Sequence, residues 1–231
     1  MSSRPSVVVF DVVETLMSLE PLRARFADVG APPEMLERWF DRLLRDGMAL
    51  TLAGDYAPFP EVAASALRTL TRGEITDDGV AHVLAGFTQL PAQPDAEDAM
   101  RLLTENGIRV VCLSNGAAQT TTDFLQRTGL ADFVERVLTV ADIRSWKPPA
   151  RVYHYALEEI GATAEQVALV AVHAFDCHGA HNVGLTTGWS SRLEGHYAEI
   201  FTPADVVGAD LVEVVQGLLA LEAPQEDLPV G

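Results

Sequence analysis

Four short runs that are rich in β-branched and other apolar residues, with polar residues at or soon after their ends, constrain the fold of this chain more than any other feature. These runs are residues 7–10, 108–113, 136–140 and 167–172. Mostly apolar runs of this length are typical of strands buried on both faces of a parallel sheet. The sequence therefore predicts a sheet whose strands are covered on both sides.

Helical patterns separate these runs. Residues 117–128 and 150–160 have amphipathic periodicity, and Gly129 and Gly161 follow them. Glycine suits the left-handed residue that ends a helix. Because strand and helix alternate, we expect an α/β fold with a Rossmann-like, doubly wound parallel sheet.

Polar side chains stand where three of the predicted strands end. They are Asp11, Ser114 with Asn115, and His173 with Asp176. Ligands of doubly wound sheets bind at the carboxyl ends of the strands. These residues are therefore expected to meet in one site.

The strand pattern disappears between residues 16 and 95. The amphipathic stretches in this part are 34–52 and 59–70. Residues 90–95 contain two prolines and read as a linker. We expect a helical cap domain over 16–95, inserted after the first strand of a core domain formed by 1–15 and 96–231.

Charge and composition exclude several functions. The formal net charge is −17 at pH 7, so binding to a nucleic-acid backbone is not expected. An anionic substrate would then need a positive group inside the site, for which Lys147 is the candidate. Cys112 and Cys177 lack the spacing of a metal site and are expected to be buried thiols.

The chain has no apolar run long enough for a signal peptide or a membrane span. We expect a cytoplasmic protein that does not bind membranes. The acidic tail, residues 222–231, is expected to be frayed. The sequence is compatible with a homodimer but does not decide the oligomeric state.

Four motifs occur in a fixed order. They are Asp11-Val-Val-Glu-Thr15, Leu113-Ser-Asn-Gly116, Lys147-Pro-Pro-Ala-Arg-Val-Tyr153, and Asp176 after the last apolar run. Together with the inserted cap, they resemble the haloacid dehalogenase superfamily over nearly the whole chain. Within it, the chain is most similar to the L-2-haloacid dehalogenases.

The resemblance implies roles for these residues. Asp11 would attack the substrate carbon and form an ester that water later cleaves. Lys147 would neutralise Asp11 and the substrate carboxylate, and Asp176 would orient Lys147 and assist ester hydrolysis. Thr15 would hydrogen-bond the nucleophile or simply fill a helix start.

Three further polar residues are candidates for binding the substrate. Ser114 and Asn115 would bind the substrate carboxylate or the departing halide, or merely cap the next helix. Tyr153 would reach the pocket by resemblance, or be a core aromatic.

Val13 discriminates between reactions. Superfamily phosphatases have a second Asp two residues after the nucleophile, which acts as acid and base for the leaving group. Val13 has no titratable group, and a halide leaves without needing a proton. Asp176 has no adjoining acid, so magnesium binding is expected to be weak or absent. We therefore expect no metal and no cofactor.

The sequence also departs from the family. Phe40 stands where dehalogenases have a cap arginine that draws off halide, and Ala171 stands where Ser is common. His173 replaces a common Asn; it would be either a base near neutral pH or a structural histidine. Glu14 replaces a small residue, and the sequence offers no account of it.

Three phenylalanines would line the pocket and exclude water, or be ordinary core residues: Phe40, Phe59 and Phe175. The leading hypothesis is hydrolysis of a short 2-haloacid, a small carboxylate, to a 2-hydroxy acid. The alternatives are a phosphatase or phosphonatase, and a pathway or binding member of the family that has lost turnover.

Overall fold

The computed structural model describes residues 3–222, and within them six strands form one parallel sheet in the order β3-β2-β1-β4-β5-β6. The strands are β1 (Val7–Phe10), β2 (Arg109–Ser114), β3 (Arg136–Thr139), β4 (Val167–Ala171), β5 (Thr186–Ser190) and β6 (Val206–Gly208). The predicted doubly wound sheet is confirmed. Apart from Glu222, the acidic tail lies outside the described residues.

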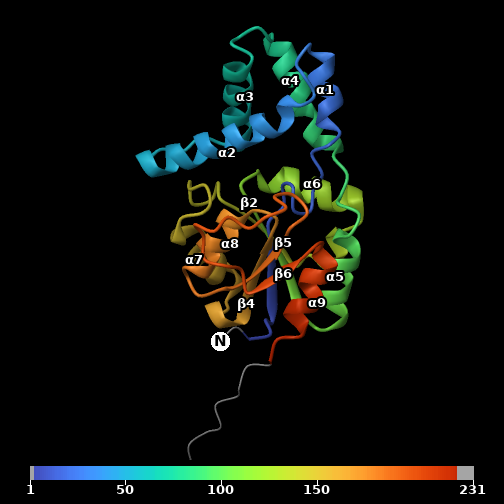
Figure 1. Cartoon of the computed structure of the whole chain (residues 1–231), viewed down its shortest axis with the longest axis vertical. Helices are drawn as coiled ribbons and strands as arrows, with labels where there is room; N and C mark the ends of the chain where they lie inside the picture. The colour runs from blue at the N-terminus through green and yellow to red at the C-terminus, as the bar shows by residue number, and fades with distance from the viewer. Residues whose placement is uncertain (1–2, 223–231) are drawn as a thin grey trace, which may run out of the picture.

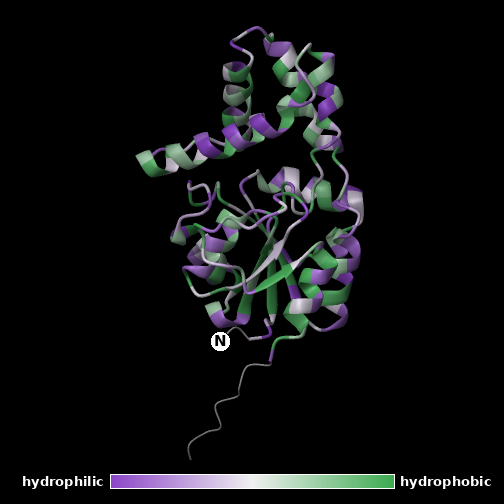
Figure 2. Ribbon diagram, in the orientation of Figure 1, coloured by the Kyte–Doolittle hydropathy of each residue, from purple (hydrophilic) through white to green (hydrophobic). Residues whose placement is uncertain are grey.

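Helices cover both faces of the sheet. They are α5 (Ala96–Glu105), α6 (Ala118–Thr128), α7 (Ala150–Ile160), α8 (Ala174–His181) and α9 (Leu211–Leu219), with the short helices η2 (Ala131–Phe133) and η3 (Ala164–Gln166). Along β1, Val8 and Phe10 pack into the cluster that contains α5 and α9, whereas Val7 and Val9 pack against α7. Alternate side chains of a strand point to opposite faces, so this strand has to be apolar throughout. Figure 2 shows that strongly hydrophobic interior.

Strands β5 and β6 were not predicted, and the reason lies in their composition. The sequence of β5 is Thr-Thr-Gly-Trp-Ser, which lacks an apolar run although every residue is buried. A Cβ on Gly188 would lie 2.5 Å from Val214 of α9, so only glycine lets that helix pack this closely. The ends of the four predicted strands agree with the observed ends of β1 to β4 to within one residue.

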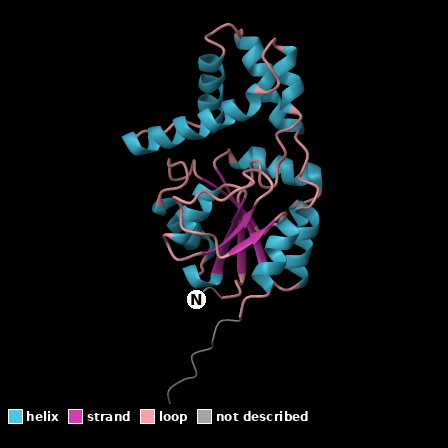
Figure 3. Cartoon of the chain, in the orientation of Figure 1, coloured by secondary structure: helices cyan, strands magenta, loops and turns pink. Residues whose placement is uncertain are grey.

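Only helices occur between β1 and α5 in the described chain. They are α1 (Leu22–Asp28), α2 (Met35–Ala53), α3 (Phe59–Leu70), α4 (Asp77–Ala85) and the short η1 (Gly86–Gln89). They form a layer beyond the carboxyl end of the sheet, as Figures 1 and 3 show. The predicted helical content of this segment is confirmed. The exact domain boundaries, 15/16 and 95/96, stay a prediction.

The helical layer contacts the core through Trp146. A Cβ on Gly47 of α2 would lie 2.3 Å from the Trp146 ring, so the helix rests directly on the indole. The Trp146 backbone N–H donates to Thr51 Oγ1 at 3.0 Å, and its indole N–H donates to the Ala57 carbonyl at 3.1 Å. The residue immediately before Lys147 is thereby fixed by the helices above it.

Cys112 and Cys177 are free and buried, as expected. Across residues 3–222 no helix combines the length and the apolar character that a membrane span requires.

Candidate active site

Asp11 follows β1 directly and lies at the centre of the sheet's carboxyl end. Its backbone N–H donates to the Val170 carbonyl of β4 at 3.0 Å. Thr15 Oγ1 donates to Asp11 Oδ2 at 2.7 Å and accepts from the Val172 N–H at 3.1 Å. The Thr15 hydroxyl therefore ties the carboxylate to the end of β4, which matches the first of its two predicted roles.

The pKa of Asp11 lies well below its ordinary value. Burial raises it, but the charges of Lys147 and His173 and their hydrogen bonds, with that of Thr15, lower it more strongly. The carboxylate is therefore ionised at neutral pH, as a nucleophile requires.

Lys147 is the only lysine of the chain, and its side chain is buried. Its ammonium donates to Asp11 Oδ1 at 3.0 Å and to Asp176 Oδ2 at 2.7 Å. Burial lowers the pKa of Lys147, but the two carboxylates outweigh burial and raise it. The lysine is therefore a permanent cation between two acids.

Asn115 positions this lysine through the backbone. Its Oδ1 accepts a hydrogen bond from the Lys147 N–H at 3.1 Å. Ser114 Oγ accepts from the Gly116 N–H at 2.9 Å and lines a neighbouring cavity rather than the one at Asp11. Of this pair, only Asn115 faces the space in front of the nucleophile.

Tyr153 takes the second of its two expected places, that of a core aromatic. It belongs to α7 and is fully buried, and its hydroxyl donates to Asp176 Oδ1 at 2.6 Å. It is not among the residues that line the cavity at Asp11. The geometry therefore corrects a substrate-binding role to support of Asp176, which Lys147 and Tyr153 hold from two sides.

A small closed cavity lies in front of Asp11, with room for about 10 Å³ of water-sized space. It is lined by Asp11, Val13, Phe40, Leu44, Phe59, Asn115, Lys147, His173, Phe175 and Asp176. The three predicted phenylalanines are thus brought together there. A second cavity of about 140 Å³ adjoins it, and Val13 and Phe59 line both.

Two arginines near Phe40 on α2 do not line this cavity. Arg42 and Arg45 both pair with Asp46, at 3.2 Å and 2.6 Å. In their place Phe40 packs against His173, with ring centroids 6.4 Å apart.

His173 forms two contacts with acids. Its Nε2 lies 2.8 Å from Glu14 Oε2, and its Nδ1 lies 3.6 Å from Asp11 Oδ2. Burial lowers the pKa of His173, but Asp11 and Glu14 together raise it to about 10. The histidine is therefore protonated at neutral pH while Asp11 is ionised, and its role as a base near neutral pH stays a prediction.

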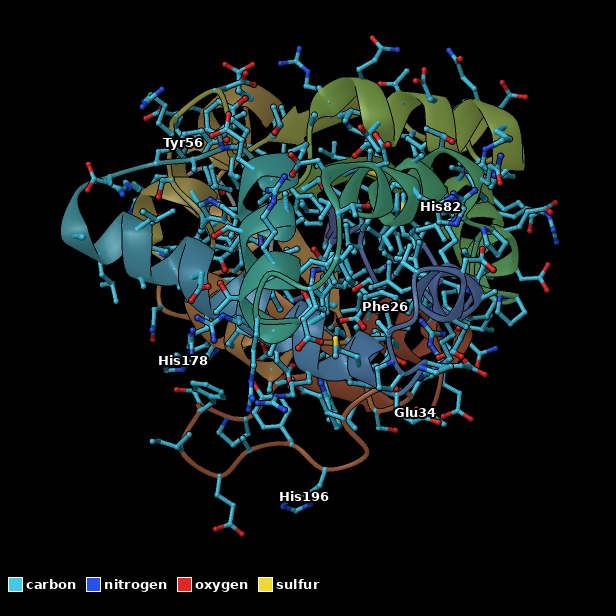
Figure 4. All side chains as sticks on the ribbon, turned by 90° about the horizontal axis from the view of Figure 1, so that it is seen from above. Phe26, Glu34, Tyr56, His82, His178 and His196 are labelled. Atoms are coloured by element: carbon cyan, nitrogen blue, oxygen red, sulfur yellow. The ribbon has the colours of Figure 1, made fainter. Side chains whose placement is uncertain are left out.

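His173 is the one histidine among the residues that line this cavity. His82, His178 and His196, which Figure 4 labels, are not among them. Sequence reasoning missed the partner of His173, because no local pattern links residues 14 and 173. The only available signal was that Glu14 replaces a small residue.

No metal centre emerges from residues 3–222: they contain no group of three or more His, Cys, Asp or Glu side chains placed to hold an ion. Asp11 and Asp176 share the ammonium of Lys147 instead. Weak or absent magnesium binding stays a prediction.

The doubly wound core, the helical layer after β1 and the acid–lysine–acid group at the strand ends are the features of a hydrolase with a Rossmann-like core and a helical cap. The chain matches the family model for haloacid dehalogenase-like hydrolases over residues 5–171 and belongs to that family.

Curated relatives and solved structures agree with this assignment. The (S)-2-haloacid dehalogenase 4A of Burkholderia cepacia is 30% identical over 78% of this chain and 80% of that protein. The (S)-2-haloacid dehalogenase 1 of Pseudomonas sp. (strain CBS-3) is 28% identical over 92% of this chain and 96% of its own. A crystal structure of a dehalogenase with an intermediate complex aligns with a TM-score of 0.84 at 27% identity. The alignment covers 93% of this chain and 97% of that one.

Proposed function

We propose that this protein hydrolyses a short 2-haloacid to the 2-hydroxy acid and halide, through an ester on Asp11. The observation that carries the proposal is a buried, ionised Asp11 that faces a closed, largely apolar cavity beside a permanent cation. A desolvated carboxylate held in line is an effective nucleophile toward carbon.

Val13 supports displacement of halide over phosphoryl transfer. It lies two residues after Asp11, lines the cavity and has no proton to give a leaving group. A halide needs none, whereas the alkoxide leaving group of a phosphate ester does. The 2-haloacid dehalogenases among the relatives support the same reaction.

The charges of the cavity support an anionic substrate. Lys147 and protonated His173 are two cations that line it, and they offset the carboxylates of Asp11 and Asp176 in the same lining. They would attract the substrate carboxylate despite the net charge of −17. Asn115 would add a polar contact from the same wall.

Back-side attack by Asp11 would invert the configuration at the substrate carbon. The small volume of the cavity at Asp11 favours acids of two or three carbons, with any longer chain directed past Val13 into the neighbouring cavity.

A halide-release screen of the pure protein in chelator tests the proposal. Chloro-, bromo- and fluoroacetate and the two enantiomers of 2-chloropropionate are the substrates, and Asp11→Asn is the control. Halide release by the wild type alone supports the proposal. Turnover of p-nitrophenyl phosphate with magnesium, without halide release, would replace it with a phosphatase, and inactivity in both assays would indicate a member that has lost turnover.

A further inference from the structure

Glu14 occupies a backbone conformation that is unfavourable for its residue type. Its φ angle is +69°, in the left-handed region where glycine is at ease. The segment is held by hydrogen bonds from the Glu14 N–H to the Met17 carbonyl at 2.9 Å and from Gln93 Nε2 to the Glu14 carbonyl at 3.1 Å. A non-glycine residue here costs about 1 kcal/mol, and such strain concentrates at functional sites.

The side chain of Glu14 pairs with His173. It is 16% exposed, and its Oε2 lies 2.8 Å from His173 Nε2. Phe40 and Phe175 flank the imidazole, with centroid distances of 6.4 Å and 5.2 Å. Because one nitrogen is bound to Glu14 and the ring is held between two aromatic rings, Nδ1 points at Asp11.

A histidine that acts as a base is commonly oriented by an acid on one ring nitrogen while the other nitrogen faces the reacting group. Here Glu14 is that acid, on Nε2, and Nδ1 faces Asp11. Building on the proposed dehalogenation, we propose that Glu14 and His173 form a pair that activates the water cleaving the Asp11 ester, with Glu14 as the positioning residue.

Formation of the ester turns the histidine into a base. In the resting state Asp11 and Glu14 both stabilise the imidazolium. Alkylation by the 2-haloacid converts the Asp11 carboxylate into a neutral ester and releases halide. The Nδ1–H then loses its anionic acceptor and its proton passes to solvent, while Glu14 keeps Nε2 protonated.

The hydrolytic step balances from there. His173 Nδ1 takes one proton of a water molecule, and the water oxygen adds to Asp11 Cγ. The Cγ–O bond to the substrate oxygen breaks, and the second water proton goes to the departing alkoxide. Hydroxy acid, the Asp11 carboxylate and the His173 imidazolium result, so the resting charges are restored.

Asp176 is less suited to this task because it is already engaged. Its two oxygens accept hydrogen bonds from Lys147 at 2.7 Å and from Tyr153 at 2.6 Å. Its contacts assign it to holding the lysine.

Rapid-quench mass spectrometry of the intact protein tests the pair. Wild type, Glu14→Gln and Glu14→Gly are mixed with chloroacetate, and the Asp11 adduct and released chloride are followed together. Glu14→Gln removes the charge at nearly constant shape. Glu14→Gly suits the backbone conformation, so its result is free of strain. In both variants the adduct should accumulate, because hydrolysis slows about 10²-fold while alkylation stays within about threefold of wild type.

Asp41→Asn is the matched control, because Asp41 is exposed and acts on Glu14 only through its charge. It should accumulate no adduct, and Glu14→Asp should restore part of the hydrolytic rate. Adduct-free turnover at the wild-type rate by Glu14→Gln, or equal slowing of alkylation and hydrolysis, would overturn the role of Glu14. Failure of the proposed function looks different: the wild type itself would then release no chloride.

Discussion

The ammonium of Lys147 lies 3.0 Å from Oδ1 of Asp11, and neither side chain has appreciable contact with solvent. The same ammonium lies 2.7 Å from Asp176. One cation therefore holds two buried acids, and its loss would leave Asp176 without a cationic partner and Asp11 with His173 alone.

Lys147→Ala should lower the rate of halide release by about 10²-fold or more, because it removes the charge that holds Asp11 and the substrate in line. Lys147→Arg should restore only part of it, since a planar guanidinium does not fit the place of an ammonium. Steady-state kinetics of purified, folded variants measure this. Arg151→Ala, which removes a cation bound to Ser145 outside the cavity, is the control. Wild-type kinetics for the alanine variant would contradict the role of Lys147.

Asp11→Asn should abolish turnover with the fold intact, because the amide has nearly the same shape but is a poor nucleophile. In a single turnover of the wild type in ¹⁸O water, the label should enter Asp11, since the product takes its oxygen from the carboxylate. Peptide mass spectrometry locates the label. Label found first in the hydroxy acid would instead indicate direct attack by water.

Val13→Ala should widen the passage between the two cavities that Val13 lines. The ratio of kcat/KM for 2-chlorobutanoate to that for chloroacetate should rise about tenfold, since a methylene in an apolar pocket is worth about 1–3 kcal/mol. Val12→Ala is the control, because Val12 is equally apolar but lines neither cavity. An unchanged ratio would show that Val13 does not limit chain length.

The pH dependence of stability should reveal the imidazolium of His173. Its pKa in the folded protein is raised to about 10, above the unfolded value near 6.5. The contribution of the imidazolium to the free energy of unfolding is therefore complete below pH 6.5. It is lost as the pH rises through 10, by at most about 1.4 kcal/mol per pH unit. Urea unfolding at pH 6, 7.5 and 9 measures it. His173→Asn should show a flatter dependence, and equal slopes in the two proteins would contradict the assigned charge.

Much of the fold follows from local pattern. Apolar runs of four to six residues mark the central strands because these are covered on both faces, and helices α3 and α7 have their predicted ends. Strand β5 gave no such signal, since Gly188 is required by the approach of Val214 from α9. That requirement comes from a residue far away in the chain.

Some features of the candidate site could likewise be predicted from the sequence, and others depend on packing. The order of Asp11, Asn115, Lys147 and Asp176 along the chain was enough to expect them together, because parallel strands end at one edge of the sheet. For Tyr153 the resemblance implied a place at the pocket, and a core aromatic was the alternative. Only packing decided that it lies behind Asp176 and supports that carboxylate from the core.

The sequence by itself determined which groups are available for the proposed chemistry, since an acid, a lysine and an apolar residue in place of a second acid are chemical identities. The tertiary structure decided their protonation. Glu14 and His173 are separated by 159 positions in the chain but lie 2.8 Å apart in the fold. A pKa depends on the charges and burial within a few ångströms, and that neighbourhood exists only once the chain has folded.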